Sequence, residues 1–183
     1  MKKIVTLYGG PGTGKSTTCA ALFMAAKQAG IDAEMNREYI KEWVWEGRKV
    51  KPGDQTYFFA KQARKERQYM ESGVELIITD SPLILTHYYG LKYDEFERSH
   101  NTSLRMLEQQ HAICKKFGYT IDHIFLDRGD RTYNPNGRFQ NEEEAIVIDN
   151  EIKSFLDEFG IKYRTVSFGD VAHLNILHGL VGA

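Results

Sequence analysis

Apolar residues follow two patterns along the chain, and the two patterns alternate. Five short runs are rich in apolar residues, which is typical of strands buried inside a parallel sheet. Between them lie longer segments in which apolar residues return every three or four positions, as they do along one side of a helix. The predicted strands cover residues 4–8, 31–35, 75–80, 121–126 and 161–166.

Seven helices are predicted between and after these strands. Gly30 is a natural end for the first, Pro82 begins the fourth and Gly90 ends it, and Asn141 caps the sixth. The polar segment 99–103 is a candidate interruption of the fifth. The predicted helices cover residues 15–29, 40–47, 54–72, 82–88, 94–117, 142–159 and 170–180.

Strands that alternate with helices indicate an α/β fold, with a parallel sheet, right-handed crossovers and helices on both faces. The 183 residues suit a single domain, 1–183, that can bury a sizeable core. Ligands of such sheets bind at the carboxyl ends of the strands. Polar residues that directly follow a predicted strand are therefore the first candidates for a functional site.

The composition is that of an ordinary globular protein, with 42% hydrophobic and 27% charged residues and a net charge of −1. This charge gives no global attraction to nucleic acid or to an anionic membrane. Cys19 and Cys114 offer neither a disulfide framework nor a metal-binding spacing, which favours a reducing cytoplasm. A strand at the very start leaves no room for a signal peptide, and no apolar run reaches membrane-spanning length. We expect a cytoplasmic protein without a membrane partner.

The octapeptide GGPGTGKS at residues 9–16 follows the first predicted strand and precedes the first helix. Strand, glycine-rich turn and helix in this order form a phosphate-binding P-loop, whose backbone N–H groups and helix N-terminus face the anion. Lys15 would contact the β- and γ-phosphates of ATP, and the Ser16 hydroxyl would bind Mg²⁺. The alternative is a plain glycine turn before an ordinary helix. The predicted ATP contacts are Gly10, Gly12, Thr13, Gly14, Lys15, Ser16 and Thr17.

Acidic residues follow two further predicted strands. Asp80 ends the third strand, and in a P-loop site this carboxylate helps to hold Mg²⁺ or its water; alternatively, it caps the helix that starts at Pro82. Glu38 follows the second strand and could accept a proton from an attacking hydroxyl, while Arg37 could hold a substrate anion. Both could instead be ordinary charges of an early helix.

The segment 127–140 is polar, rich in turn-forming residues and rich in arginine, so it is interpreted as a lid of about 128–141. Arginine stabilises the charge that spreads over a phosphoryl group during transfer, and a closed lid excludes water. Arg131 and Arg138 are the predicted catalytic arginines, whereas Arg128, nearest the strand, is assigned to the adenine. A solvated charged loop is the alternative.

The helix 54–72 would cover the acceptor in a protein that binds two substrates. Gln62 and Arg64 are candidate acceptor contacts, and Tyr57 could stack on a planar ring. Against this, basic residues on a helix are usually solvated and aromatic residues usually belong to the core. The six histidines show no metal-ligand spacing.

Four segments together carry a resemblance to a known group: GGPGTGKS, then NREY, a helix containing AKQ, and TDSP, followed by the arginine-bearing lid. The chain resembles small P-loop kinases, above all the nicotinamide-riboside kinase domain of NAD-regulator proteins. It is similar to short bacterial and phage kinases described as AAA-like ATPases, and more distantly to thymidylate and deoxynucleoside kinases.

The resemblance implies a P-loop NTPase fold with five parallel strands in the order 2-3-1-4-5. It implies that the γ-phosphate of ATP passes to a hydroxyl or phosphate of a nucleoside-like acceptor. It implies that Lys15 and Ser16 contact phosphate and Mg²⁺, that Asp80 is the family's acid after the third strand, and that Glu38 is the acid after the second. In deoxynucleoside kinases an arginine follows the acid at the position of Asp80, whereas this chain has Ser81 there.

Three functions follow as hypotheses. The first is an ATP- and Mg²⁺-dependent kinase for a nucleoside, nucleotide or related small molecule, acting as a monomer or homodimer. The second is a kinase whose acceptor is a hydroxymethylated base or an end in DNA, for which the basic stretch 48–67 would suit the backbone. The third is an NTPase switch that changes partners with its nucleotide.

Overall fold

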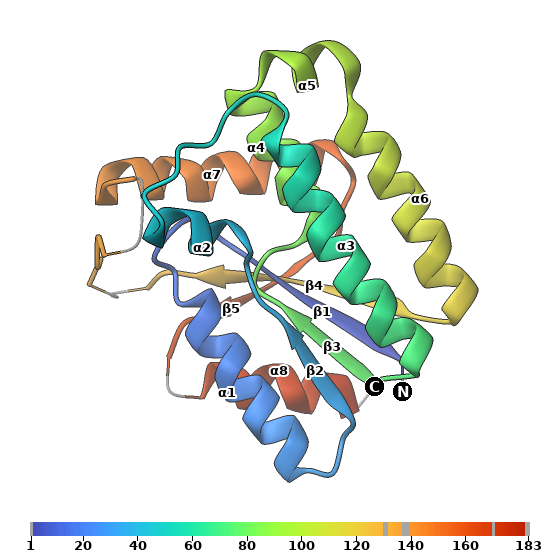
Figure 1. Ribbon diagram of the computed structural model, residues 1–183. Helices are drawn as coiled ribbons and strands as arrows, with labels where there is room; N and C mark the ends of the chain where they lie inside the picture. The colour runs from blue at the N-terminus through green and yellow to red at the C-terminus, as the bar shows by residue number, and fades with distance from the viewer. Residues whose placement is uncertain (1, 130–131, 137–139, 170, 182–183) are drawn as a thin grey trace.

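A computed structural model describes residues 2–129, 132–136, 140–169 and 171–181. Its centre is a five-stranded parallel sheet in the order β2-β3-β1-β4-β5 (Figure 1). This confirms the predicted α/β class and strand order. The strands are β1 (Lys3–Tyr8), β2 (Ala33–Asn36), β3 (Leu76–Thr79), β4 (Thr120–Asp127) and β5 (Arg164–Ser167).

Helices cover both faces of this sheet (Figure 1). Four of them, α3, α4, α6 and α7, bury apolar residues against one face, and α1 and α8 lie side by side on the other. The helices are α1 (Lys15–Gln28), α2 (Ile40–Trp45), α3 (Asp54–Ser72), α4 (Leu83–Tyr93), α5 (Glu95–His100), α6 (Thr102–Phe117), α7 (Glu142–Glu158) and α8 (Ala172–Val181).

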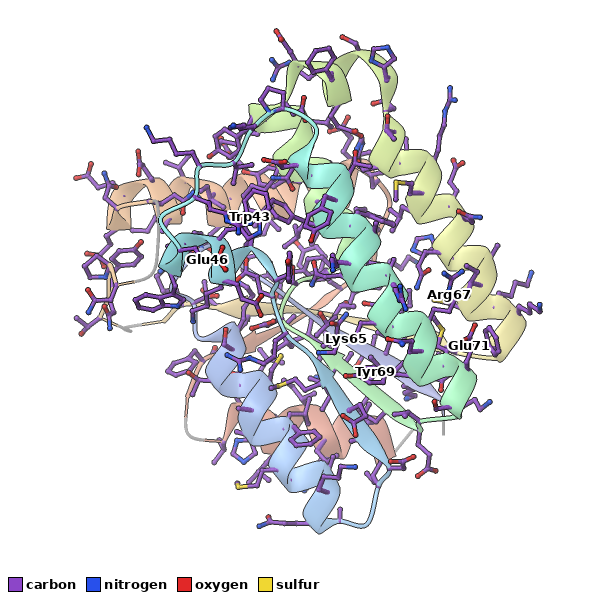
Figure 2. The ribbon with its side chains drawn as sticks, viewed as in Figure 1. Trp43, Glu46, Lys65, Arg67, Tyr69 and Glu71 are labelled. Carbon is purple, nitrogen blue, oxygen red and sulfur yellow. The ribbon has the colours of Figure 1, made fainter. Side chains whose placement is uncertain are left out.

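α3 shows how sequence pattern sets the orientation of a helix on the sheet. Lys65 and Arg67 are exposed on its outer side (Figure 2), whereas Phe59 and Met70 are buried against the sheet and its neighbouring helices. One side of this helix therefore belongs to the core and the other to solvent.

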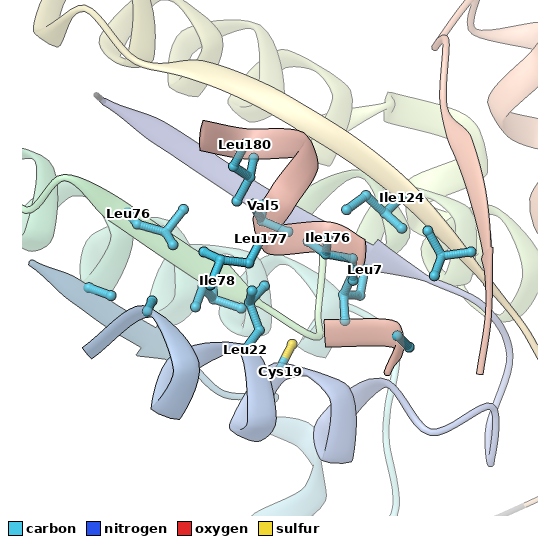
Figure 3. Packing of buried hydrophobic residues seen from close by; sticks show 14 of the residues in the cluster. Val5, Leu7, Cys19, Leu22, Leu76, Ile78, Ile124, Ile176, Leu177 and Leu180 are labelled. Atoms are coloured by element: carbon cyan, nitrogen blue, oxygen red, sulfur yellow. The ribbon is translucent and has the colours of Figure 1, made fainter. Parts of the chain in front are cut away.

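The core beneath α1 and α8 is formed by apolar side chains of the sheet and of these two helices. Val5 of β1 and Ile78 of β3 meet Leu22 of α1 and Ile176 of α8, and all four are almost completely buried (Figure 3). Burying a side chain of this size contributes about 1.5–3 kcal/mol. This packing anchors the helix that begins directly at the P-loop.

Several predicted boundaries differ from the structure, and three of these differences have a clear physical reason. The second strand begins at Ala33 rather than at residue 31, since the Ile31 N–H still donates to Ala26 O and closes the end of α1. The fifth begins at Arg164 rather than 161, because the Ile161 N–H donates to Leu156 O at the end of α7.

The third difference is that Gly90 does not end α4, which continues to Tyr93. The glycine is required for packing, because a Cβ there would lie 2.6 Å from Cγ of Glu97. The expected interruption within 94–117 is confirmed: Asn101 takes a left-handed conformation, with φ of 50°, and separates α5 from α6.

Buried polar contacts hold α4, α5 and α6 together. Glu97 Oε1 accepts hydrogen bonds from the Ser103 N–H and hydroxyl, and it lies 3.1 Å from Nδ1 of His87. Asp94 caps α5 and also accepts the N–H of Gly53, just before α3. The end of α4 and the start of α3 are thereby fixed relative to one another. No helix in the described part of the chain is long and apolar enough to cross a membrane.

The buried Glu66 of α3 makes stability depend on pH. Burial raises the pKa of its carboxyl from 4.5 to about 7, although the side chains of Gln110 and Asn36 oppose part of this rise. The unfolded chain releases the proton near pH 4.5 and the folded chain only near 7. The contribution of this group is therefore complete below pH 4.5 and is lost as the pH rises through 7.

We expect Glu66→Gln to remove this loss. The free energy of unfolding of the variant, minus that of the unmodified protein, should therefore be larger at pH 8 than at about pH 4, by up to about 3 kcal/mol. Urea unfolding across this range measures the difference. Glu71→Gln, which changes an exposed acid on the same helix, is the control and should show no such trend. A difference that does not vary with pH would contradict the buried, protonated carboxyl.

Candidate active site

The glycine-rich loop leaves β1 and enters α1 through a backbone that only glycine adopts readily. Gly12 and Gly14 have φ of 83° and 95°, and Gly14 is the N-cap of α1. The space around the loop is equally restrictive: a Cβ on Gly10 would lie 2.6 Å from Ala145 O, and one on Gly12 would lie 2.9 Å from the Tyr133 ring. Conformation and close packing both require these glycines.

Lys15 lies over the loop that precedes it. Its ammonium donates to the carbonyls of Gly9 and Gly10 at 2.7 and 2.9 Å. Burial lowers the pKa of Lys15, and the negative charges of Glu38, Asp80 and Asp149 oppose that shift. A cation at this point, beside the N-terminus of α1, is suited to the phosphates of a nucleotide.

Asp80 joins three segments at the carboxyl edge of the sheet. Its Oδ2 accepts the Ser16 hydroxyl at 2.6 Å, and its Oδ1 accepts the Glu38 N–H at 2.9 Å. The parallel register explains this meeting, because Thr79 at the end of β3 is paired with Thr6 of β1 on one side and with Asn36 of β2 on the other.

The Ser16 and Asp80 oxygens fit a Mg²⁺ ion bound together with phosphate. Mg²⁺ keeps several waters and takes one or two protein oxygens beside those of the substrate phosphates. In the described ranges, no three His, Cys, Asp or Glu side chains cluster as an all-protein metal site would require. A hydroxyl and a carboxylate within 2.6 Å of each other at the P-loop supply the smaller ligand set that such an ion needs.

A buried ion pair holds the loop from the opposite side. Arg128 donates through Nε and Nη2 to Asp149 Oδ2 at 3.0 and 2.8 Å, and Nη2 also donates to Pro11 O. Asp149 Oδ1 accepts the N–H of Gly10. The Nη1 atom of Arg128 is buried beside Gly12 and has no hydrogen-bond partner among the described residues. The pair thus connects β4 and α7 to the loop backbone.

Sequence reasoning missed Asp149. One signal was present, since this acid lies among the buried apolar residues Ala145, Ile148 and Ile152 of a predicted helix. A charge on a buried face needs a partner. Nothing in the spacing indicated that the partner is Arg128, 21 residues away.

A cavity of about 1090 Å³ extends from the loop between α3, α4 and α7. The loop, Lys15 and Asp80 line one end. Glu38 also lines the cavity. Burial raises the pKa of the Tyr89 phenol, and the negative charge of Glu38 raises it further, while the same charge opposes the lowering of the Lys15 pKa. The other end is walled mainly by apolar side chains, namely those of Ile40, Val44, Val50, Pro52, Phe58, Leu85, Tyr89 and Tyr93.

Most residues assigned from the sequence border this cavity or support its wall. Gly10 and Thr13 belong to the loop behind the wall, where the Thr13 hydroxyl donates to Gly10 O. Their roles toward ATP stay predictions. The assigned residues that line the cavity directly are Gly12, Gly14, Lys15, Ser16, Thr17, Glu38, Gln62 and Asp80.

Arg37, Tyr57 and Arg64 were assigned to the acceptor, but the structure places all three outside the cavity and exposed. For Tyr57 and Arg64, the reason is the orientation of α3. Gln62 lies on the face toward the cavity, while the Tyr57 hydroxyl meets that of Tyr39 on the outer side.

The lid arginines have different outcomes. Arg131 and Arg138 lie outside the described residues. Arg128, assigned to the adenine, is bound through Nε and Nη2 to Asp149 and the loop, which gives it a supporting role that the sequence did not indicate.

A family model described as an AAA domain matches residues 4–173, and the chain belongs to this family, AAA_28. Comparison with curated proteins gives no match. Among solved structures, the NadR protein in complex with NR shares 20% identity at a TM-score of 0.70, with all of this chain and 52% of that one covered. This chain thus spans about half of that protein. APE1195 shares 17% identity at a TM-score of 0.52, and the match covers 99% of this chain and 95% of APE1195. The fold is that of a P-loop NTPase.

Asp149→Asn tests whether the Arg128–Asp149 pair acts as a clamp that holds the P-loop in place. Loss of this charge leaves the buried Arg128 without its counter-ion, and breaking a buried pair on one side costs about 3–5 kcal/mol of stability. We expect ATP to bind at least about tenfold more weakly, a loss of about 1.4 kcal/mol. Fluorescence titration with an ATP analogue and urea unfolding measure the two effects. Asp157→Asn, an exposed acid on the same helix, is the control; equal behaviour of the two variants would refute the clamp.

Proposed function

We propose that this chain is an ATP- and Mg²⁺-dependent kinase that transfers the γ-phosphate of ATP to a hydroxyl or phosphate of a nucleoside, nucleotide or related small molecule. One observation carries the proposal: a single cavity joins the phosphate-binding loop to an apolar compartment. At about 1090 Å³ the cavity exceeds the roughly 300–1,000 Å³ of a site for one small ligand. A donor and an acceptor can therefore meet inside it.

At the donor end, Lys15 and the N–H groups of the loop bind the phosphates, and the clamped backbone keeps these donors in place. Ser16 and Asp80 would hold Mg²⁺, which neutralises charge that develops on the phosphate oxygens. The predicted contribution of Arg131 and Arg138 is to stabilise the same charge from the lid.

At the acceptor end, we assign the role of base to Glu38. Both oxygens of Asp80 already accept hydrogen bonds, from Ser16 and from the Glu38 N–H. Glu38 lines the same cavity as Lys15 and Tyr89, and its negative charge influences the pKa of both. From there its carboxylate can orient an acceptor hydroxyl and take its proton.

The fold shared with NadR supports nicotinamide riboside as one acceptor to test, because that protein was solved in complex with NR. The apolar compartment, with Phe58 and Tyr89 in its wall, suits the ring of a nucleoside. Two buried free cysteines, Cys19 and Cys114, support a location in the reducing cytoplasm.

The test is to incubate the protein with labelled ATP, Mg²⁺ and a panel of acceptors containing nicotinamide riboside, common nucleosides and nucleoside monophosphates. We expect at least one phosphorylated acceptor and no transfer when EDTA removes Mg²⁺. Ser16→Ala should lower kcat about a hundredfold or more, because charge stabilisation in the transition state is lost. Ser154→Ala, an exposed serine on α7, is the control. ATP hydrolysis without any phosphorylated acceptor would contradict a kinase and favour the NTPase switch.

A kinase whose acceptor lies in DNA is the second candidate, favoured by charge. Residues 37–67 contain nine lysines and arginines against five acids. Lys49 and Lys51 line the cavity, and the exposed side of α3 continues this basic surface with Lys61, Arg64, Lys65 and Arg67. In the described part of the chain, none of these four residues forms an ion pair.

Anisotropy titrations of a single-stranded oligonucleotide at several salt concentrations test this candidate. Each phosphate contact contributes about 0.7 to the slope of log affinity against log salt for single strands. We expect the combined change of Lys61, Arg64 and Lys65 to alanine to reduce that slope. Changing Lys115 and Lys116, which are exposed on α6, should leave it unaltered. Binding that is absent, or insensitive to salt, removes the candidate.

A further inference from the structure

Resting on the function proposed above, we infer that Gln55 binds the hydrogen-bonding edge of the acceptor. The phosphoryl acceptor is then a planar heterocycle whose edge offers a hydrogen-bond donor beside a hydrogen-bond acceptor, as a lactam or a carboxamide does. Gln55 would decide which rings enter the apolar compartment.

Gln55 is the second residue of α3 and is 6% exposed, yet its side-chain amide has no hydrogen-bond partner in the described part of the chain. It lines the cavity. Most of the Gln55 side chain is buried, but its amide atoms are not among the enclosed side-chain atoms that lack a partner, so they open onto the cavity. An amide carries two N–H donors and a carbonyl acceptor. With none of them used in the described part of the chain, these groups are available to a ligand.

Gln62 provides an internal comparison, because it is another buried glutamine on the cavity face of the same helix. Its Oε1 accepts the Ser81 hydroxyl at 3.0 Å, and its Nε2 donates to Ser81 O at 3.2 Å. Thr86, across the cavity, likewise donates its hydroxyl to Leu83 O. These polar groups are used within the protein, whereas no described residue bonds to the amide of Gln55.

The surroundings of Gln55 indicate a flat, apolar ligand body. Phe58, one turn further along α3, is 3% exposed. Its ring meets the Trp43 ring edge-on, with 4.8 Å between the two ring centroids. Leu85 and Tyr89 of α4 line the same cavity. Apolar walls with a few correctly placed polar groups are the usual design of a site for a small ligand, since the walls bind the ring and polar groups such as Gln55 select it.

The backbone that carries Gln55 is held firmly. Gly53, in a left-handed conformation at the N-cap of α3, donates its N–H to Asp94 at the start of α5. The Lys51 N–H donates to Asp54, the first residue of the helix. An amide on a helix fixed at both sides of its first turn can discriminate between ring edges with little rearrangement.

Binding to the full-length protein tests the inference with three riboside probes. Uridine presents a lactam edge and nicotinamide riboside a carboxamide, whereas phenyl C-riboside presents neither. Calorimetry in the presence of an ATP analogue gives the affinities, and Gln55→Met removes the hydrogen-bonding groups at similar volume. We expect uridine or nicotinamide riboside to bind about tenfold to a hundredfold more weakly to this variant, while the phenyl riboside and the ATP analogue bind as before. Gln68→Met, an exposed glutamine of α3, is the control.

A second measurement uses only the unmodified protein. The side-chain ¹⁵N amide signals of Gln55, assigned by through-bond correlation to the Gln55 backbone, should shift when uridine or nicotinamide riboside is added. If neither probe binds, or if Gln55→Met binds them as tightly as the unmodified protein, the inference is overturned. Probe binding that depends on Gln55 without phosphoryl transfer would refute only the kinase function, whereas transfer that Gln55→Met leaves unchanged would refute only the role of Gln55.

Discussion

The two oxygens of Asp80 connect the parts of this molecule that must act together. One accepts the Ser16 hydroxyl at the start of α1, and the other accepts the Glu38 N–H after β2. Asp80 itself follows β3, so three crossovers converge on a single carboxylate. The parallel register makes this convergence unavoidable, because β1, β2 and β3 end at the same edge of the sheet. The Ser16–Asp80 pair, proposed to hold Mg²⁺, and the proposed base Glu38 are consequently placed by the sheet.

The loop between β1 and α1 is held from the other side by the Arg128–Asp149 pair. Asp149 accepts a loop N–H, and Arg128 donates to a loop carbonyl. The glycines fit between these supports with no room for a side chain. Such a loop can present its N–H groups to phosphate with little rearrangement, because the protein has already oriented them.

The acceptor end is built from one face of α3 and one face of α4. Both are positioned by buried polar contacts of the helical layer, namely those among His87, Glu97 and Ser103 and those of Asp94. The two glutamines on this face of α3 differ, because the amide oxygen and nitrogen of Gln62 both bond to Ser81, whereas the amide of Gln55 has no partner in the described part of the chain. The same orientation turns Tyr57 and Arg64 outward, where they join the basic surface of α3.

By itself, the sequence determined the alternation of strands and helices, the loop at residues 9–16, and the assignment of Ser16, Glu38 and Asp80 to the ends of neighbouring strands. These features depend on periodicity and on local backbone preference, both of which are written in consecutive residues. The tertiary structure decided the rest: that Arg128 pairs with Asp149, that α4 runs past Gly90 because Glu97 packs there, and that α3 presents Gln55 to the cavity in place of Tyr57. Spacing along a chain gives the faces of a helix, but only the packing of distant elements decides which face covers the site and which charges meet.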